Sequence, residues 1–522
     1  MMKFLREFWK WLTELFRRKK VKVAEKPIEV SLTEEVKVPV QIPERPTKPK
    51  IPIISKKKKP DILIRVGIDF GTRFTKVAYK IFGIPGRRLI RPVLFNHKLI
   101  TCPKFCLPSV AAFDEKQNLL LGIEAEQLLH GKELNYGLRM LKVVLAGRHD
   151  PTFHDNESDT VFRQYMKDNT GDDNKFSPEF ITAVYIAYVI NESRKHILEE
   201  EEISDSEVTM EFNICMPIDH IENNNVRTVF EKNIAWAELI ERLWEQNIVN
   251  YDFFQKAIEL ESRVSYQPEN PETQVFAVAE AVAEGASYFN SLGRQGGIHA
   301  IIDFGAGTTD VAIFNLTDCR DKEEKAYFYA ADNIPKGAVK IERIIADHLQ
   351  NISGRNTNTV DVFETLQQLT RNYIERYPEL KSKITNYLQE LWKSTHSAWS
   401  TAYRHLTKET HWHQVQVFVC GGGAKTPYVE YIFSEPWWEQ LQNFQIRYPV
   451  DYLPEPDEYD NINRQVPFHR MAVAYGLSYF SWEDFKKYIL PKDCPDHTPP
   501  PLPSKSYESP DGKLYPTRGW LG

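Results

Sequence analysis

Two segments far apart in the chain, residues 66–77 and 300–311, combine the residue types that phosphate chemistry needs. Each reads as an apolar strand, an Asp-Phe-Gly turn rich in small residues, and a second strand. Glycines in a tight turn let backbone N–H groups come close to a phosphate. Asp69 and Asp303 end the two first strands, and carboxylates next to phosphates require a cation between them, usually Mg²⁺. The spacing therefore predicts two hairpins that grip one magnesium nucleotide.

A single turn of this kind is also what an ordinary β-hairpin needs. Two copies about 230 residues apart, each following a strand of buried type, indicate instead an internal duplication of a nucleotide-binding half. A third segment, residues 417–427, reads as a strand that ends in three consecutive glycines. By itself such a run is a flexible turn, and its position after the two hairpins is what makes it informative.

In this order, the three segments resemble the phosphate and adenosine loops of the actin-like ATPase superfamily, which includes actin, sugar kinases, MreB and the DnaK-like seventy-kilodalton heat-shock chaperones. The resemblance extends over about residues 61–488. It implies an α/β fold with two lobes, that is, duplicated ribonuclease-H-like halves around a nucleotide cleft. The first lobe would comprise about residues 61–290 with 470–488, and the second about 298–468. ATP or ADP and Mg²⁺ are the cofactors that the resemblance implies.

Finer matches favour the chaperone branch of the superfamily. Residues 107–113 resemble the segment after the first phosphate loop in both DnaK-like proteins and MreB. Residues 280–288 are similar to the Glu-Pro-x-Ala-Ala-Ala helix of the chaperones. Residues 390–397 resemble a chaperone helix that clamps the adenosine, and residues 472–476 resemble the final connecting helix.

The resemblance implies a role for each matching residue. Asp69 and Asp303 would hold the hydrated Mg²⁺. Glu280, with Asp303 or Asp310, would orient the attacking water, and Lys142 would stabilise the charge that develops on the phosphate. The residues that would contact the nucleotide are Gly71, Thr72, Arg73, Gly305, Ala306, Gly307, Thr308, Gly337, Glu390, Lys393, Gly421, Gly422, Gly423 and Lys425.

Several positions depart from the family pattern. Lys142 lies one residue too far from the Gly-Arg pair that follows the family's catalytic lysine. Lys336 precedes Gly337 where the family has another glycine, and it could offer its charge to a phosphate. Arg470 stands where an Asp is usual, and Gly423 replaces a serine-type residue near the adenine. These departures favour ATP binding over fast hydrolysis.

The elements that must position these residues alternate between strands and helices. We expect a helix over residues 180–199 and a strand over 208–216. A long helical stretch over residues 361–406 would form the outer part of the second lobe. A final helix over residues 472–480 would return to the first lobe.

The two ends of the chain differ in composition from this body. Residues 1–20 place apolar side chains at helical spacing among basic ones, a pattern typical of a helix at an anionic membrane surface, with a helix that docks on a partner as the alternative. Residues 21–60 read as a Pro/Lys-rich linker, residues 61–490 as the ATPase domain and residues 491–522 as a Pro-rich tail.

The charge is distributed unevenly along the chain. The first 60 residues hold 17 Lys and Arg against 7 Asp and Glu, so the net charge of −6 conceals an acidic body. No nucleic-acid partner is expected for such a body. Six cysteines in 522 residues fit a reducing compartment, so we expect a cytoplasmic protein, attached peripherally to a membrane if the first helix binds one.

Three function classes remain open at this point. Only about 40 mostly Pro-rich residues follow the last family motif, so the peptide-binding domain of DnaK-like chaperones is not expected. We favour an ATP-binding, slowly hydrolysing molecular switch that a protein partner reads. A membrane-associated filament protein resembling MreB and a small-molecule kinase of the same superfamily are the alternatives.

Overall fold

The structure is a computed structural model, and it describes residues 62–99, 102–129, 137–149, 156–173, 175–217, 221–244, 251–291, 294–316, 326–353, 371–406, 409–438, 446–461 and 465–495. The predictions for residues 1–20 and 21–60, and for the tail beyond residue 495, lie outside these ranges. Within the described ranges, no helix combines the length and the apolar character needed to cross a membrane.

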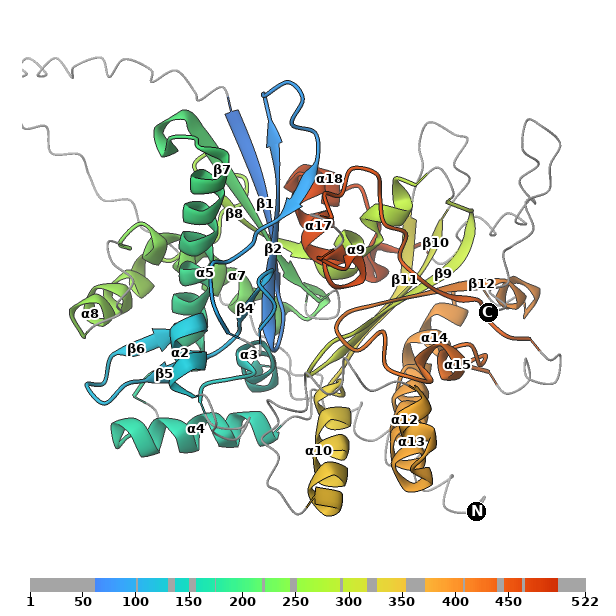
Figure 1. Cartoon of the computed structure of the whole chain (residues 1–522). Helices are drawn as coiled ribbons and strands as arrows, with labels where there is room; N and C mark the ends of the chain where they lie inside the picture. The colour runs from blue at the N-terminus through green and yellow to red at the C-terminus, as the bar shows by residue number, and fades with distance from the viewer. Residues whose placement is uncertain are drawn as a thin grey trace, which may run out of the picture. The chain divides into compact units, whose positions relative to one another are not determined.

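The first sheet lies in residues 62–291, which we call the first half (Figure 1). Its strands are β1 (Ile62–Phe70), β2 (Phe74–Phe82), β3 (Ile90–Pro92), β4 (Cys106–Pro108), β7 (Val208–Met216) and β8 (Val275–Ala279). They follow the order β3-β2-β1-β7-β8, with β4 paired to β2. β1 is antiparallel to β2 and parallel to β7, and β7 is parallel to β8. The strand predicted over residues 208–216 is confirmed as β7.

The second sheet lies in residues 294–461, the second half. Its strands are β9 (Gly297–Phe304), β10 (Thr309–Leu316), β11 (Ala326–Ile334), β12 (Val415–Cys420) and β13 (Val450–Tyr452). Their order, β11-β10-β9-β12-β13, repeats that of the first sheet, because three antiparallel strands are again followed by two parallel ones. The chain is therefore a mixed α/β protein that uses one strand topology twice, as an internal duplication predicts.

Helices fill the connections between the strands (Figure 1). Those before the second sheet are α2 (Gly122–Leu128), α3 (Leu141–His149), α4 (Asn156–Thr170), α5 (Pro178–Glu201), α7 (Asn224–Glu241), α8 (Tyr251–Glu259) and α9 (Glu280–Phe289). Those of the second half are α10 (Val339–Ser353), α12 (Arg371–Glu375), α13 (Pro378–Ser394), α14 (His396–Tyr403) and α15 (Val429–Phe433). The chain then adds α17 (Ala472–Tyr479) and α18 (Trp482–Phe485).

Smaller elements complete the fold. Strands β5 (Ala111–Phe113) and β6 (Leu119–Leu121) form a separate hairpin. Short 3-10 helices are η1 (Asp205–Glu207), η2 (Leu260–Arg263), η3 (Glu409–His413), η5 (Phe468–Arg470) and η6 (Pro491–Asp493). The described chain thus continues through the start of the predicted Pro-rich tail.

Local sequence explains the ends of the longest helix, α5. The Ser177 hydroxyl accepts a hydrogen bond from the Phe180 backbone N–H, and Pro178 occupies the first turn, where its missing N–H costs nothing. The helix ends at Glu202, whose backbone is left-handed. The helix predicted over residues 180–199 is therefore confirmed. In the stretch predicted to be helical over residues 361–406, the structure describes α12, α13 and α14 and does not cover the first residues.

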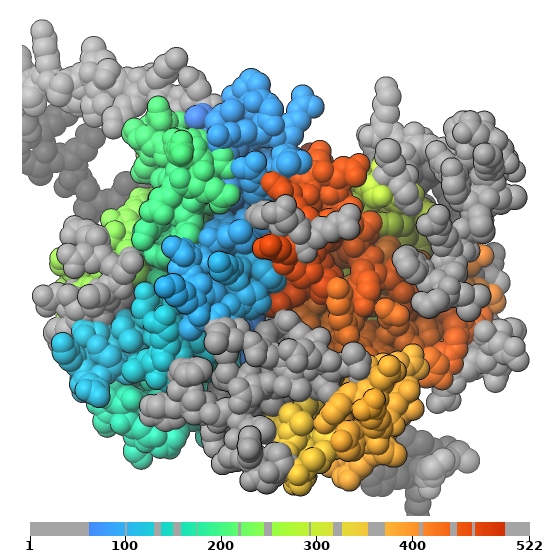
Figure 2. Space-filling model, in the orientation of Figure 1, coloured from blue at the N-terminus to red at the C-terminus, as the bar shows by residue number. Residues whose placement is uncertain are grey.

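The final helix returns to the first half, as predicted for residues 472–480. α17 packs so closely on β1 and α9 that two glycines are needed at the contact. A Cβ on Gly67 would lie 2.2 Å from the carbonyl oxygen of Ala474, and one on Gly476 would lie 1.8 Å from that of Ala283. Figure 2 shows the red C-terminal residues next to the blue first strands on this face. One hydrophobic core joins α17 to the first sheet, and a second core lies between the second sheet and its helices.

Candidate functional site

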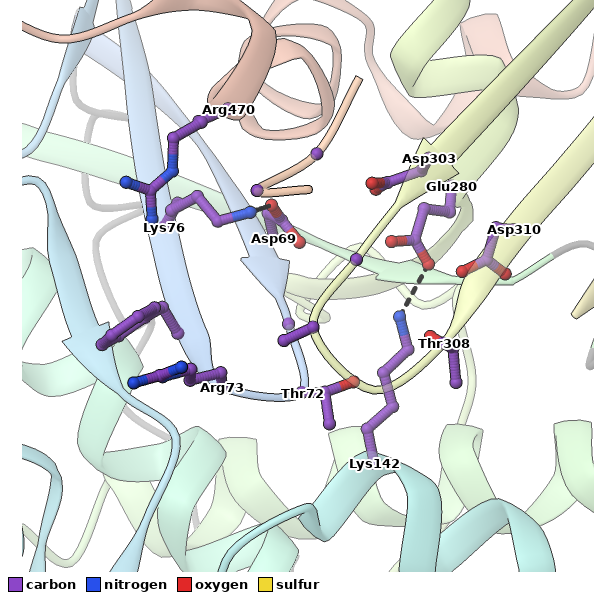
Figure 3. A pocket seen from close by; sticks show the side chains of 16 residues that line it. Asp69, Thr72, Arg73, Lys76, Lys142, Glu280, Asp303, Thr308, Asp310 and Arg470 are labelled. Carbon is purple, nitrogen blue, oxygen red and sulfur yellow. Dashed lines mark hydrogen bonds and ion pairs between the residues drawn. The ribbon is translucent and has the colours of Figure 1, made fainter. Parts of the chain in front are cut away.

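A cavity of about 510 Å³, including the part open to solvent, is lined by residues of both halves (Figure 3). The first half supplies the turn between β1 and β2, one residue of α3 and the first residue of α9. The second half supplies the turn between β9 and β10 and the loop after β12. The lining residues are Asp69, Gly71, Thr72, Arg73, Phe74, Lys76, Lys142, Glu280, Asp303, Gly305, Ala306, Thr308, Asp310, Gly421, Gly422 and Arg470.

Both hairpin turns require glycine because their backbones fold back on themselves. A Cβ on Gly71 would lie 2.4 Å from the carbonyl oxygen of Phe74, and one on Gly305 would lie 2.9 Å from that of Thr308. Thr72 and Thr308 belong to these turns and line the cavity. The two turns therefore present small side chains and closely approachable backbone to the same space.

The glycine run after β12 approaches the second hairpin from another side. Gly421 has a φ of +86°, and a Cβ there would lie 1.9 Å from Oδ1 of Asp303. Gly423 donates its backbone N–H to the Phe304 carbonyl oxygen at 2.8 Å, and its missing side chain makes room for the Phe304 ring. Gly422, by contrast, faces open space, since a Cβ added there would have no atom within 4 Å. Gly421 and Gly423 therefore pack against β9, while Gly422 between them faces the cavity.

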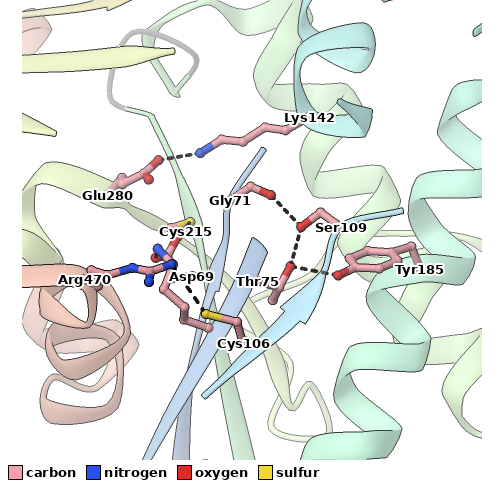
Figure 4. Close-up of polar contacts among 11 residues, drawn as sticks. Asp69, Gly71, Thr75, Cys106, Ser109, Lys142, Tyr185, Cys215, Glu280 and Arg470 are labelled. Carbon is pink, nitrogen blue, oxygen red and sulfur yellow. Dashed lines mark hydrogen bonds and ion pairs between the residues drawn. The ribbon is translucent and has the colours of Figure 1, made fainter. Parts of the chain in front are cut away.

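A hydrogen-bonded chain supports the first turn from behind (Figure 4). The Ser109 hydroxyl donates to the Gly71 carbonyl oxygen at 2.7 Å and lies 3.0 Å from the Thr75 hydroxyl. The Tyr185 hydroxyl of α5 in turn donates to the Thr75 hydroxyl at 3.0 Å. Because these side chains are buried, the turn is held in one geometry before any ligand binds.

Asp69 at the end of β1 has an internal cationic partner. It stands opposite Lys76 in the antiparallel register of β1 and β2, and the Lys76 ammonium contacts its carboxylate (Figure 3). Burial lowers the pKa of Lys76, but attraction to Asp69 and Asp303 outweighs burial and raises that pKa above its ordinary value. The thiol of Cys215 on β7 donates to the other Asp69 oxygen at 3.8 Å.

Lys142 and Glu280 form a second buried ion pair, which Figures 3 and 4 both show. The Lys142 Nζ lies 2.7 Å from Oε2 of Glu280, and each side chain is only 5% exposed. Burial lowers the pKa of Lys142, while the attraction of Glu280 raises it and prevails. The structure thus places Lys142 in the cavity lining, where it was predicted to act.

The acids of the second half lack such partners. Asp303 stands opposite Asp310 in the register of β9 and β10, and Asn333 donates to Asp310 at 2.6 Å. Among the described residues, no Lys or Arg forms an ion pair with Asp303, Asp310 or the nearby Glu284 of α9. Burial raises the pKa of Glu284 well above the usual carboxyl range, and repulsion from Asp303 and Glu280 adds to this.

Two arginines bring further positive charge to the cavity. Arg73, in the first turn, pairs with Glu342 of α10 in the second half, and its guanidinium lies 5.3 Å from the Phe74 ring centre. Arg470 lies over the Phe105 ring at 5.1 Å and donates to the Cys106 sulfur at 3.8 Å (Figure 4). Its buried Nε has no hydrogen-bond partner among the described residues. An anionic ligand in the cavity would meet both guanidinium groups.

Most of the residues predicted for the site lie together in the cavity lining. Outside the lining, Gly307 abuts Thr72, since a Cβ on it would lie 2.7 Å from Cγ2 of Thr72, and Gly337 packs in the same way on Ala306. Lys425 lies 5.9 Å from the Tyr452 ring centre. The predicted residues that do not line the cavity are Gly307, Gly337, Glu390, Lys393, Gly423 and Lys425.

Two predicted adenosine contacts, Glu390 and Lys393, are exposed on α13. Lys336 is close to them, because its Nζ donates to the hydroxyl of Ser394 at 3.0 Å. These three residues therefore share one region of the second half, separate from the cavity lining.

The sequence interpretation misses several residues of the site. Lys76 belongs to the first motif, but the sequence interpretation assigns it no function. In the β1–β2 hairpin it lies directly opposite Asp69. Arg470 stands out only as a departure from the family. Glu284 and Glu342 carry no signal, because their positions depend on how α9 and α10 pack against the sheets.

Comparison with known proteins finds no family model and no curated protein that matches this chain.

Proposed function

We propose that the cavity binds ATP and ADP and that the chain is a nucleotide-dependent switch with a two-lobed actin-like fold, of the DnaK-like type. The observation that carries the proposal is that both Asp-Phe-Gly hairpins, from two sheets that share a five-strand order, line one cavity together with a third glycine loop. A triphosphate has the length and charge to engage both turns at once.

The phosphate groups would lie between the hairpin turns. Thr72 and Thr308 offer hydroxyl groups there, and Arg73 and Arg470 offer guanidinium groups that suit phosphate oxygens. The open space in front of Gly422 leaves room for the sugar and base. These contacts use residues of both halves, so a bound nucleotide would stabilise the arrangement of the two halves that forms the cavity.

The fit to Mg²⁺ is different on the two sides of the cavity. Asp303 and Asp310 line the cavity, and neither forms an ion pair with a Lys or Arg among the described residues, so their carboxylates suit a cation that keeps several water ligands. Asp69 is already in contact with Lys76. The residues present therefore fit a Mg²⁺ ion held from the Asp303 side, where it would neutralise phosphate charge. The role proposed for Asp69 is to hold Lys76.

Hydrolysis would depend on the Lys142–Glu280 pair. Water attack on a phosphate needs positioning and neutralisation of charge rather than covalent help. Glu280, the first residue of α9, is placed to accept a hydrogen bond from a water in the cavity, and Lys142 holds this carboxylate in position. Because Lys142 is committed to Glu280 in this arrangement, slow turnover is expected.

The proposal is tested by calorimetric titration of the full chain with ATP and ADP, alongside steady-state release of phosphate. We expect saturable binding and slow turnover. Glu280→Gln should preserve binding and remove turnover, because the amide keeps the shape and loses the charge that orients the water. Absence of binding by the folded wild type would contradict the proposal.

A protein partner, and attachment of residues 1–20 to an anionic membrane at the cytoplasmic side, complete the proposed function. Sedimentation of the full chain with anionic vesicles tests the attachment. Nucleotide-dependent light scattering would point to a filament protein instead, and ADP formation that depends on an added acceptor would point to a kinase.

A further inference from the structure

Two groups of metal-ligand atoms, arranged alike, combine residues that line the cavity with residues that are buried next to it. Each consists of an Asp at the end of a first strand, a Cys on the parallel neighbouring strand and a Glu of α9, with one ligand atom of each within 4.8 Å of the others. The first group is Asp69, Cys215 and Glu280, and the second is Asp303, Cys420 and Glu284. The two glutamates are four residues apart on α9, so one helix serves both groups.

In the first group, each carboxylate is paired with a buried ammonium group. The ammonium of Lys76 contacts Asp69, and the ammonium of Lys142 lies 2.7 Å from Glu280. Each carboxylate therefore has its own internal cation. A metal ion at this group would have to displace two buried ammonium groups, which disfavours its binding.

In the second group, the two carboxyl groups have no cationic partner among the described residues. Glu284 is 1% exposed and Asp303 is 8% exposed, and neither forms an ion pair with any residue in the described part of the chain. Oδ1 of Asp303 and Oε1 of Glu284 are buried and receive no hydrogen bond from a donor in the described residues, and the two carboxyl groups lie within hydrogen-bond reach of each other. Two acids this close in a protein interior need a shared proton or a shared cation.

The donor set selects the kind of cation. Mg²⁺ prefers six oxygen ligands and retains several waters, whereas the Sγ of Cys420 is a soft donor that favours Zn²⁺ or Co²⁺. Cys420 stands directly opposite Asp303 in the register of β12 and β9. We propose that Glu284, Asp303 and Cys420 form a binding site for a divalent transition-metal ion of the Zn²⁺ class.

The site adjoins the space into which a ligand would enter. Asp303 and the neighbouring Gly421 line the main cavity, while Glu284 lines a smaller cavity beside it together with Asp310. Three protein ligands leave a fourth position of a tetrahedral metal ion for a water or another oxygen. The proposal does not require nucleotide binding, and a metal held here would be resident rather than delivered with a nucleotide.

Equilibrium dialysis of the full chain against Zn²⁺, in a reducing buffer without nucleotide, tests the site. The test variants are Glu284→Gln and Cys420→Ser, and the matched controls in the first group are Cys215→Ser and the double variant Lys142→Met, Glu280→Gln, which leaves no buried charge unpaired. We expect tight binding by the wild type and by both controls, and at least about tenfold weaker binding by both test variants. Equal binding by test and control variants would mean adventitious zinc and would overturn the proposal, as would no tight binding by the wild type.

Co²⁺ substitution provides a readout that does not depend on affinity alone. A thiolate bound to Co²⁺ produces a sulfur-to-metal charge-transfer absorption, which we expect in the wild type and in Cys215→Ser but not in Cys420→Ser. A band that survives Cys420→Ser overturns the assignment of this thiol. Zinc binding without ATP binding would support the metal site and contradict the proposed nucleotide function. ATP binding without zinc binding would support the nucleotide function and contradict the metal site.

Discussion

The two hairpins of the cavity share one strand register and differ in their charged side chains. In the first hairpin the residue opposite the strand-end Asp69 is Lys76, and in the second the residue opposite Asp303 is Asp310. The register and the glycine turn are the same, so the difference lies in side chains alone. The first hairpin neutralises its own acid, whereas the second leaves buried carboxylates that require charge from elsewhere.

Because of this difference, the two sides of the cavity carry opposite charge. On the side of the first hairpin the cavity lining holds four cationic side chains, those of Arg73, Lys76, Lys142 and Arg470. Near the second hairpin it holds Asp303 and Asp310, with Glu284 behind them. We infer that the basic side chains near the first hairpin supply charge for an anionic ligand and that the acids near the second hairpin supply ligands for a cation. One strand topology used twice can in this way provide two complementary functions.

The largest predicted effect is loss of a first-half cation. Lys142→Met leaves the buried carboxylate of Glu280 without its partner, and we expect a destabilisation of about 3–5 kcal/mol by chemical denaturation. The double variant Lys142→Met, Glu280→Gln should recover much of this loss. Lys383→Met removes an exposed pair with Glu379 and should change stability little. If Lys142→Met lowered the free energy of unfolding no more than Lys383→Met does, the stability of the first half would not depend on the pairing of Glu280 with Lys142.

A second prediction compares two adjacent glycines. Gly421→Ala adds a Cβ at 1.9 Å from Asp303 and places alanine at a φ of +86°, so we expect a loss of about 1–3 kcal/mol. Gly422→Ala adds its Cβ to open space and should be nearly neutral. Thermal unfolding of the two variants, side by side, measures the difference. Equal stabilities would mean that the loop does not approach Asp303 as closely as described.

A third prediction concerns pH in the metal-free protein. Burial raises the pKa of Glu284, so the folded chain keeps a proton that the unfolded chain loses above the ordinary carboxyl pKa of 4.5. The resulting contribution to stability falls as the pH rises above this value, by up to about 1.4 kcal/mol per pH unit. Glu284→Gln should reduce this decline, measured as urea denaturation at several pH values in a chelating buffer. Identical pH profiles of the variant and the wild type would contradict the account in which Glu284 and Asp303 share their buried site without a cationic partner.

The smallest predicted effect is on the contact between the halves. Glu342→Gln weakens the hold of α10 on Arg73 and frees the guanidinium for a phosphate. We expect ATP to bind a few-fold more tightly, on the order of tenfold at most. Glu379→Gln, on the exposed face of α13, is the control and should leave the affinity unchanged. Weaker ATP binding by Glu342→Gln would mean that Glu342 positions Arg73 for the ligand.

The sequence is sufficient to predict the parts of the site that depend on local chemistry. The glycine turns, the strand-end acids and the strand over residues 208–216 follow from periodicity and turn requirements, and the structure places them as expected. The pairing of Asp69 with Lys76 could also have been predicted, because a hairpin register follows from its turn.

Other features depend on tertiary packing and leave no trace in local sequence. Arg73 meets Glu342 across 269 residues of chain, and no motif marks that glutamate. Glu284 reads as an ordinary helical glutamate until α9 is packed against β9 with Asp303 facing it. Arg470 stands where the proteins that the sequence resembles have an acid, so the resemblance gives no role to its charge, although that charge suits the proposed ligand.

The most direct test of nucleotide binding between the two halves is to fill the cavity without disturbing its walls. Gly422 lines the cavity and faces open space, so Gly422→Trp should fold normally and occupy the room proposed for the sugar and base. Calorimetric titration with ATP should show binding by the wild type and by Gly422→Ala, and loss of binding by Gly422→Trp. Undiminished ATP binding by a folded Gly422→Trp variant would place the nucleotide elsewhere and contradict this account.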